Sequence, residues 1–298
     1  MKGRGTGSGP PAPGPQKLSP GLAALLRFGL ARHQLPRPPP PPPLQATPPS
    51  PSADPGPGSG PPGRRRPSAG PPPASTPPRL DTPGFKVAVI SRDSSRLERL
   101  QSFVSPGTKD NLTTMVGNVG SEEGAEQAKQ DLLKAVGKVT DIVSSLGFSW
   151  WQGGPPHTQS LKDLHWVMET LLFSTFVSWK AFFPLVRDDP GSTYSFITGG
   201  AGEKLLMPGT GFLTVGAAST LAFCQVLRDE YPELPCKLNQ VKINAGVAPP
   251  ERSAPGYLSS LDLGEAVASL VERRSTSHSV FTVSCPADSK AVILERSL

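Results

Sequence analysis

The segment from Thr193 to Phe223 limits most strongly what this chain can fold into. It reads TYSFITGGAGEKLLMPGTGFLTVGAASTLAF, an apolar run, then a glycine-rich turn, then small and apolar residues at helical spacing. An apolar run without polar alternation is typical of a strand buried on both faces of a parallel sheet. The segment therefore predicts a strand, a turn and a helix of an α/β fold.

Alternating strand and helix patterns continue across residues 85–298. Phe85 to Ser91 is a continuous apolar run, which again predicts a strand buried on both faces. Leu161 to Val186 is long and apolar enough to predict a helix buried over most of its surface. Further strands are predicted at 113–119, 141–145, 237–244 and 280–284, and further helices at 94–103, 121–136, 213–227 and 261–273. Strands that alternate with helices predict a Rossmann-like, doubly wound parallel sheet of the α/β class.

The first 84 residues differ sharply in composition from the rest. About two thirds of the 38 prolines precede Phe85. Such a segment buries little apolar surface and cannot offset the conformational entropy that is lost on ordering. We therefore expect residues 1–84 to be a disordered tail rich in Pro, Gly and Arg, and residues 85–298 to form one folded domain.

The net charge of +6 is a property of this tail. Residues 1–84 hold ten basic and two acidic residues, which leaves 20 basic and 22 acidic residues in 85–298, a net charge of −2. Binding of nucleic acid by the folded domain therefore has no electrostatic support. The cysteines, Cys224, Cys236 and Cys285, lack the spacing of a zinc site, so we expect no metal site and reduced thiols in an intracellular compartment.

Two motifs of the tail bear on location and partners. Lys17 to Leu35 has apolar residues near helical spacing with arginines and no acid, a pattern compatible with an organellar transit peptide, plastid or mitochondrial. A cytosolic location stays open. Pro36 to Pro43 has the form of a ligand for an SH3-type or other proline-reading partner, and the alternative is a stiff solvated linker. No apolar run reaches the roughly 18 residues of a membrane span, so we expect no membrane association.

The segment from Thr193 to Phe223, with the elements around it, resembles the catalytic part of the short-chain dehydrogenase/reductase family. In that family the strand ends in a serine, a Tyr-x-x-x-Lys motif lies on the following helix, and an asparagine lies on the preceding long helix. The resemblance puts these four catalytic positions at Gly199, Leu213, Ala217 and Leu171. It therefore implies a divergent member whose catalytic residues have been replaced.

The resemblance also implies positions for a nucleotide cofactor. Arg92 directly follows the first predicted strand, where a basic residue of the family pairs with the 2′-phosphate of NADP. Gly147 is retained from an Asn-Asn-Ala-Gly motif beside the adenine, and both asparagines are replaced. Asn244 to Pro250 resembles the turn on the nicotinamide side. NADP is accordingly the expected cofactor, held by Ser91, Arg92, Gly147, Ala248 and Pro249.

The glycine-rich unit that opens the fold of this family is not recognisable. In the family a central strand and the loop TGxxxGxG cradle the pyrophosphate on backbone amides. The residues ahead of Phe85 are GRRRPSAGPPPASTPPRLDTPG, from which we expect neither a buried strand nor a helix. Either the natural protein lacks the unit, or the sequence is a truncated or frame-altered version of a longer one. An absent central strand exposes the edges of its neighbours, so we expect marginal stability or oligomerisation.

Three functions are compatible with this sequence. The first is an NADP(H)-binding protein without Ser-Tyr-Lys catalysis, which serves in nucleotide sensing or as a scaffold. The second is an active, atypical NADP-dependent reductase that uses other residues, such as Lys204 and Thr214. The third is a non-catalytic interaction protein that forms a homodimer through the helices at 161–186 and 213–227, with close approach at Gly216, Ala217, Ala218 and Ser219.

Overall fold

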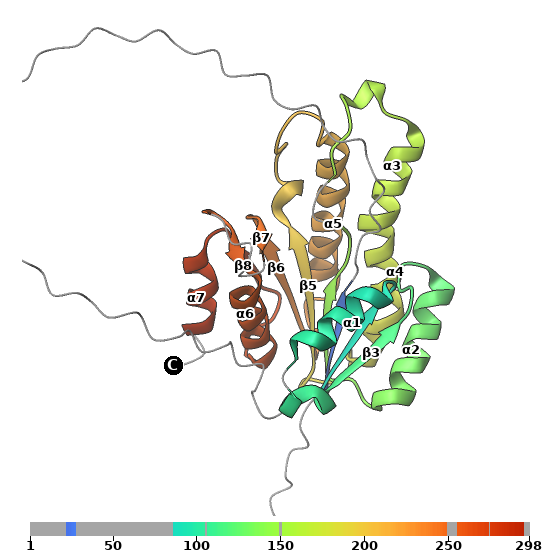
Figure 1. Cartoon of the computed structure of the whole chain (residues 1–298), viewed down its shortest axis with the longest axis vertical. Coiled ribbons are helices and arrows are strands. Elements are labelled where there is room, and N and C mark those ends of the chain that lie inside the picture. The colour runs from blue at the N-terminus through green and yellow to red at the C-terminus, as the bar shows by residue number, and fades with distance from the viewer. Residues whose placement is uncertain are drawn as a thin grey trace, which may run out of the picture. The chain divides into compact units, whose positions relative to one another are not determined.

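A seven-stranded parallel sheet forms the centre of the structure (Figure 1). The computed structural model describes residues 22–27, 86–104, 106–148, 151–248, 255–273 and 275–294. The strand order is β3-β2-β1-β4-β5-β6-β9, and every neighbouring pair is parallel. The strands are β1 (Leu22–Arg27), β2 (Lys86–Ser91), β3 (Leu112–Val116), β4 (Asp141–Ser145), β5 (Thr193–Gly199), β6 (Lys237–Ile243) and β9 (Val280–Val283). This order, with its reversal between β1 and β4, is that of a doubly wound α/β fold, as predicted.

Helices cover both faces of the sheet. Successive residues of a strand point to opposite faces, so each strand contributes side chains to two cores. Leu238 of β6 belongs to a core with α2, α4 and α5, whereas Val241 belongs to a second core with α6 and α7. The helices are α1 (Ser94–Phe103), α2 (Glu122–Val136), α3 (Leu161–Met168), α4 (Ser174–Phe182), α5 (Gly211–Glu230), α6 (Ser260–Glu272) and α7 (Pro286–Leu294). The helix α7 and the two-residue strands β7 (Val247–Ala248) and β8 (Leu258–Ser259) were not predicted.

Strand β1 overturns the expectation that the central strand is absent. Leu22 lies opposite Lys86 of β2, and Arg27 lies opposite Ser145 of β4, so β1 pairs on both sides. The segment 1–84 thus supplies the central strand, and the reason to expect marginal stability from its loss is removed. These six residues also form a strand where the pattern of Lys17–Leu35 suggested a helix. The other predictions for the tail, including the proline run and the place of a glycine-rich loop, lie outside the described residues.

Several helices begin at polar side chains that cap their first turn. The Asp93 carboxylate accepts a hydrogen bond from the Arg96 amide at 3.3 Å and starts α1 directly after β2. The Ser121 hydroxyl does the same for α2, accepting from the Gly124 amide at 3.3 Å. Ser160 starts α3 and forms a capping box with the residue three positions on. Such caps satisfy backbone amides that have no partner within the helix, and so they fix where each helix begins.

The long helix predicted at 161–186 is continuous but not uniform. It consists of α3, the π-helical turn η3 (Glu169–Phe173), α4 and a final 3₁₀ turn, η4 (Phe183–Leu185). A π-helical turn widens the helix by one residue and is often found at functional sites. This turn places Leu171 at the cavity that lies by the carboxyl ends of β4 and β5.

Helix α5 is, within the described part of the chain, the one helix long and apolar enough to cross a membrane by length and composition. This finding corrects the expectation that no segment is long and apolar enough to span a membrane. One side of this helix is buried inside the fold, at Leu213, Gly216, Ala217, Thr220, Cys224 and Leu227. Packing inside the fold therefore accounts for part of its apolar composition, whereas Val215 and Val226 of α5 are exposed.

Candidate active-site cavity

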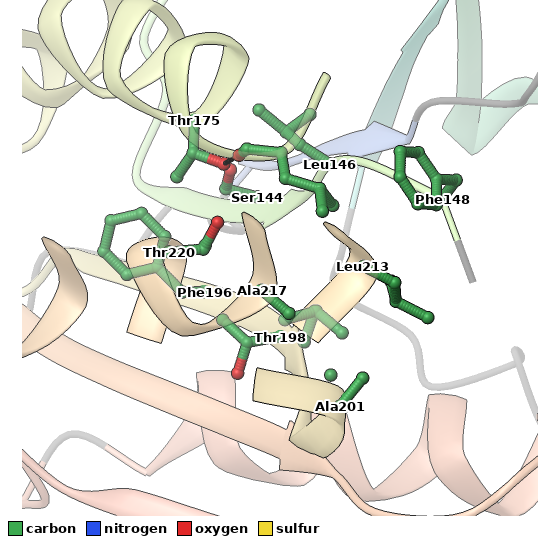
Figure 2. Close-up of a pocket in the computed structure, with 13 residues that line it drawn as sticks. Ser144, Leu146, Phe148, Thr175, Phe196, Thr198, Ala201, Leu213, Ala217 and Thr220 are labelled. Atoms are coloured by element: carbon green, nitrogen blue, oxygen red, sulfur yellow. Dashed lines mark hydrogen bonds between the residues drawn. The ribbon is translucent and has the colours of Figure 1, made fainter. Parts of the chain in front are cut away.

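A cavity of about 90 Å³ lies at the carboxyl ends of β4 and β5, between the π-helical turn and α5 (Figure 2). In doubly wound sheets, ligands bind outside this edge of the strands. The cavity brings together all four positions that the resemblance assigned to catalysis, Leu171, Gly199, Leu213 and Ala217. It is completed by Ser144, Leu146, Phe148, Thr175, Phe196, Ile197, Thr198, Ala201 and Thr220.

Leu171 closes one side of the cavity. A Cβ placed on Gly216 of α5 would lie 2.8 Å from the Leu171 Cδ1, so α5 approaches the π-helical turn as closely as a glycine permits. The Leu171 carbonyl accepts a hydrogen bond from the Thr175 hydroxyl at 2.6 Å. The position that carries an amide side chain in the family is therefore filled here by a buried hydrocarbon.

Leu213 and Ala217 lie one turn apart on α5 and face the cavity together. Gly199 ends β5 opposite them, and a Cβ placed on it would meet no atom within 4 Å. The four positions that the resemblance assigned to catalysis thus lie around one cavity, and none of them carries a hydroxyl, phenol or amine. None of the side chains that line this cavity is an acid or base that titrates near neutral pH.

Four of the five residues predicted to bind the cofactor are described, and none of these four lines the cavity. Ser91 is buried, and its hydroxyl accepts a hydrogen bond from the Asp93 amide at 3.2 Å. Arg92 follows it and is exposed. Gly147 follows β4 with φ of 102°, a conformation that favours glycine. Ala248 is buried in β7, and Pro249 falls outside the described residues.

The lysine considered for an atypical reaction stands apart from the cavity. Lys204 is exposed, and the neighbouring Glu203 contacts Lys242 and accepts a hydrogen bond from the Asn244 amide group at 3.3 Å. The hydrogen bond from Lys242 is the main reason that the pKa of Glu203 lies below its usual value. Across the described ranges, no group of three His, Cys, Asp or Glu residues could hold a metal ion.

The Ser144, Thr175 and Thr220 hydroxyls that line the cavity were not predicted from the sequence. Ser144 comes from β4, Thr175 from α4 and Thr220 from α5, and each is less than 10% exposed. Serine and threonine inside apolar helices bond back to carbonyls one turn earlier, which hides their polarity in a hydrophobic pattern. The sequence signal for such groups is a serine or threonine at a position where the apolar pattern predicts a buried side chain.

Solved structures that are similar to this chain include several dehydrogenases. An alcohol dehydrogenase from the archaeon Thermococcus sibiricus, complexed with 5-hydroxy-NADP, is 18% identical, with a TM-score of 0.55 over 67% of this chain and 85% of that chain. A dehydrogenase/reductase from Sinorhizobium meliloti 1021 is 20% identical, with a TM-score of 0.57 over 69% and 86%. A short-chain dehydrogenase from Burkholderia cenocepacia J2315, in complex with NADP, is 16% identical, with a TM-score of 0.57 over 69% and 88%. The sequence matches no family model. The chain thus has the fold of the short-chain dehydrogenases/reductases, as predicted.

Proposed function

We propose that this chain binds NADP(H) at the carboxyl edge of its sheet without catalysing the Ser-Tyr-Lys reaction of dehydrogenases of this fold. The observation that carries the proposal is the cavity itself, where apolar residues occupy all four catalytic positions. Reduction of a carbonyl needs a proton donor with a suitable pKa beside the hydride donor. The lining side chains are hydrocarbons and aliphatic hydroxyls, which do not serve as that donor.

The position of Arg92 supports the choice of NADP. Its side chain is exposed at the end of β2, where it would pair with the 2′-phosphate, and Gly147 retains the glycine of the motif that lies beside the adenine in the family. Two of the solved neighbours were determined with NADP or 5-hydroxy-NADP. Bound NADPH would supply a hydride, and this chain would contribute binding and orientation.

Nucleotide titration tests the proposal. The full chain is titrated with NADPH and NADH, with tryptophan fluorescence as the readout. We expect tighter binding of NADPH, and a loss of about tenfold in Arg92→Ala, which removes a charge-assisted contact to phosphate. Arg99→Ala, on the exposed side of α1, is the matched control and should keep the preference for NADPH. Equal affinity of the unmodified chain for both nucleotides would contradict the choice of NADP.

Restoring the catalytic groups tests the missing reaction. The triple variant Gly199→Ser, Leu213→Tyr, Ala217→Lys should oxidise NADPH with carbonyl or quinone substrates, whereas the unmodified chain should not. Turnover by the unmodified chain at a rate like that of the triple variant would contradict the proposal.

An atypical reductase is the second candidate, favoured by one buried hydroxyl. The Thr214 hydroxyl on α5 is buried and has no hydrogen-bond partner among the described residues. If NADPH is turned over, Thr214→Val and Lys204→Ala should each abolish the reaction under this hypothesis. Unchanged turnover in both variants would remove it.

A homodimer is the third candidate, favoured by apolar side chains that remain exposed on the long helices. Phe173 and Phe176 are 44% and 45% exposed, and Val215 and Val226 of α5 are 49% and 51% exposed. The prediction that Gly216 and Ala217 contact a second copy is wrong, because both residues are buried within the chain. Phe176→Lys with Val226→Lys should convert a dimer to a monomer in sedimentation, whereas Val116→Lys on β3 should not. A proline-reading partner of the tail is tested separately: deletion of residues 36–43 should abolish binding of that partner, and unchanged binding would contradict a role of the tail.

A further inference from the structure

Four apolar side chains are exposed at one end of the molecule, where α3 and α5 begin. Leu205, Leu206 and Met207, in the loop between β5 and α5, are 56%, 45% and 42% exposed, and Leu161 at the start of α3 is 80% exposed. Figure 1 shows the amino-terminal ends of α3 and α5 at the same end of the molecule, beyond the carboxyl end of β5. We call these four residues the apolar rim. Exposed apolar groups that gather in this way mark surfaces for a partner or a membrane.

The loop that carries three of these residues is anchored at both of its ends. Before it, α5 packs so closely on Gly202 that a Cβ there would lie 2.4 Å from the Ala218 amide nitrogen. After it, the hydroxyl and the amide of the buried Thr210 donate to the Met207 carbonyl at 2.8 Å and 3.2 Å. The apolar side chains are therefore presented to solvent by a fixed backbone.

Hydrogen bonds join this loop to the segment that leads into α3. The Gly153 amide donates to the Gly209 carbonyl at 2.9 Å, and the side-chain amide of Gln152 donates to the Pro208 carbonyl at 3.1 Å. The segment that these bonds hold continues to Leu161, the first residue of α3. Both parts of the apolar rim are thus attached to each other as well as to the fold.

Positive charge accompanies the apolar rim. Lys204 is exposed and directly precedes Leu205. The one acid of this loop, Glu203, forms an ion pair with Lys242, so its negative charge is compensated. The loop therefore presents apolar side chains beside a cation, which is the combination that an anionic membrane surface attracts.

The directions of the side chains favour a bilayer over a protein partner. Consecutive side chains leave the backbone in different directions in helices and strands alike, yet Leu205, Leu206 and Met207 are all exposed. A protein surface contacts one side of such a loop, whereas the fluid interface of a bilayer surrounds it. Residues 1–84, with ten basic and two acidic residues, add charge that favours anionic headgroups.

We propose that the apolar rim docks this chain on the surface of an anionic lipid bilayer. Its four side chains enter the boundary between headgroups and acyl chains, and Lys204 lies among the headgroup phosphates. A peripheral contact of this kind needs no spanning segment, so the proposal departs from the expectation of no membrane association, which rested on the length of apolar runs. It goes beyond NADP(H) binding, because it requires neither a nucleotide nor a reaction.

Sedimentation of the full chain with vesicles tests the proposal. The vesicles contain phosphatidylcholine alone, or phosphatidylcholine with about one third phosphatidylserine. We expect binding to the anionic vesicles, and a loss of about tenfold in the double variant Leu205→Gln, Leu206→Gln, because two apolar side chains no longer leave water. The matched control is Phe103→Gln with Val280→Gln, at the end of α1 and the amino end of β9, where the side chains are 65% and 42% exposed. This control should bind as the unmodified chain does.

A fluorophore gives a second readout that reports insertion itself. It is attached at Leu206→Cys in a Cys285→Ala background, because Cys285 is exposed whereas Cys224 and Cys236 are buried. We expect its emission to shift to the blue when anionic vesicles are added. The emission of the same label at Val280→Cys should stay unchanged.

Four results would overturn the proposal. The first two are equal binding to both kinds of vesicle and binding to neither. The third is full binding of anionic vesicles by the Leu205→Gln, Leu206→Gln variant, which would assign binding to the basic residues of 1–84. The fourth is a dimer without vesicles that this variant loses, which would assign the apolar rim to a second copy. The label at Leu206→Cys keeps the test decisive if the double variant fails to fold, and NADPH affinity is measured without vesicles, so the two proposals fail independently.

Discussion

Gly147 and Leu171 are packed so closely that a Cβ on Gly147 would lie 2.5 Å from the Leu171 Cδ2. Gly147 belongs to the turn that follows β4, and Leu171 belongs to the π-helical turn between α3 and α4. The glycine also has a φ of 102°, which residues with a side chain adopt only with strain. Contact between these two turns fixes one wall of the cavity.

The first prediction is that Gly147→Ala destabilises the fold. Backbone strain and the clash with Leu171 together should lower the free energy of unfolding by about 2–4 kcal/mol, measured by urea denaturation. Gly264→Ala in α6 is the control, because a Cβ there meets no atom within 4 Å and should be neutral or stabilising by about 0.5–1 kcal/mol. A loss below about 0.5 kcal/mol in Gly147→Ala would show that the turn can move aside.

The second prediction is that Gly199 accepts a serine at little cost. Its φ of −99° and ψ of 142° are ordinary extended values, and a Cβ there meets nothing within 4 Å. Gly199→Ser should therefore change the free energy of unfolding by no more than about 0.5 kcal/mol. The contrasting variant is Gly202→Ala, whose Cβ would lie 2.4 Å from the Ala218 amide nitrogen, and we expect a cost of about 2 kcal/mol or more. Similar costs for both would contradict the geometry of this turn.

Most of the sheet could be predicted from the sequence because buried parallel strands appear as apolar runs. The predicted strand 141–145 has the observed bounds, and the helix 94–103 is also observed without change. Strand β1 escaped prediction for a physical reason. Its sequence LAALLR lacks β-branched residues and is favourable for a helix, so its extended form comes from pairing with β2 and β4.

The four positions that the resemblance assigned line one cavity, and the Ser144, Thr175 and Thr220 hydroxyls beside them were not predicted. Gly199, Leu213 and Ala217 could be placed by spacing, because a strand, a turn and a helix fix their separation. The Ser144, Thr175 and Thr220 hydroxyls could not, because which side of a buried helix faces a cavity depends on tertiary packing. The π-helical turn adds to this difficulty, since one extra residue rotates every later position of the helix.

The third prediction concerns a hydrogen-bond chain that ends at the cavity wall. Arg228 donates from Nη1 to the Gln240 Oε1 at 2.6 Å, and Gln240 donates from Nε2 to the Thr198 Oγ1 at 2.9 Å. Gln240 is 2% exposed, so Gln240→Met preserves its volume and leaves both partners unsatisfied, at a cost of about 1–3 kcal/mol.

A double-mutant cycle with Thr198→Val measures the coupling within this chain. We expect Gln240→Met and Thr198→Val to be non-additive by about 1 kcal/mol in urea denaturation, because each removes the same hydrogen bond. Additivity within about 0.3 kcal/mol would show that the bond contributes nothing to stability.

The fourth prediction is a loss of stability at alkaline pH. Burial raises the pKa of the Cys224 thiol from 9.0 to about 12 and that of the Cys236 thiol to about 11. The unfolded chain releases these protons above about pH 9, whereas the folded chain retains them. The two protonated thiols therefore make their full contribution to the free energy of unfolding below about pH 9. This contribution is lost as the pH rises toward the pKa values of the thiols in the folded chain. Each thiol should contribute at most about 1.4 kcal/mol per pH unit.

Urea midpoints measured between about pH 7.5 and pH 10.5, with reductant present, check this slope. The double variant Cys224→Ala, Cys236→Ala should lose most of this dependence of stability on pH. The remaining dependence is assigned to Tyr194, because burial also raises the pKa of its phenol. Cys285→Ala is the control, because this thiol is exposed and its removal should leave the slope unchanged. A slope that persists in full in the double variant would assign the alkaline loss to groups other than these buried thiols.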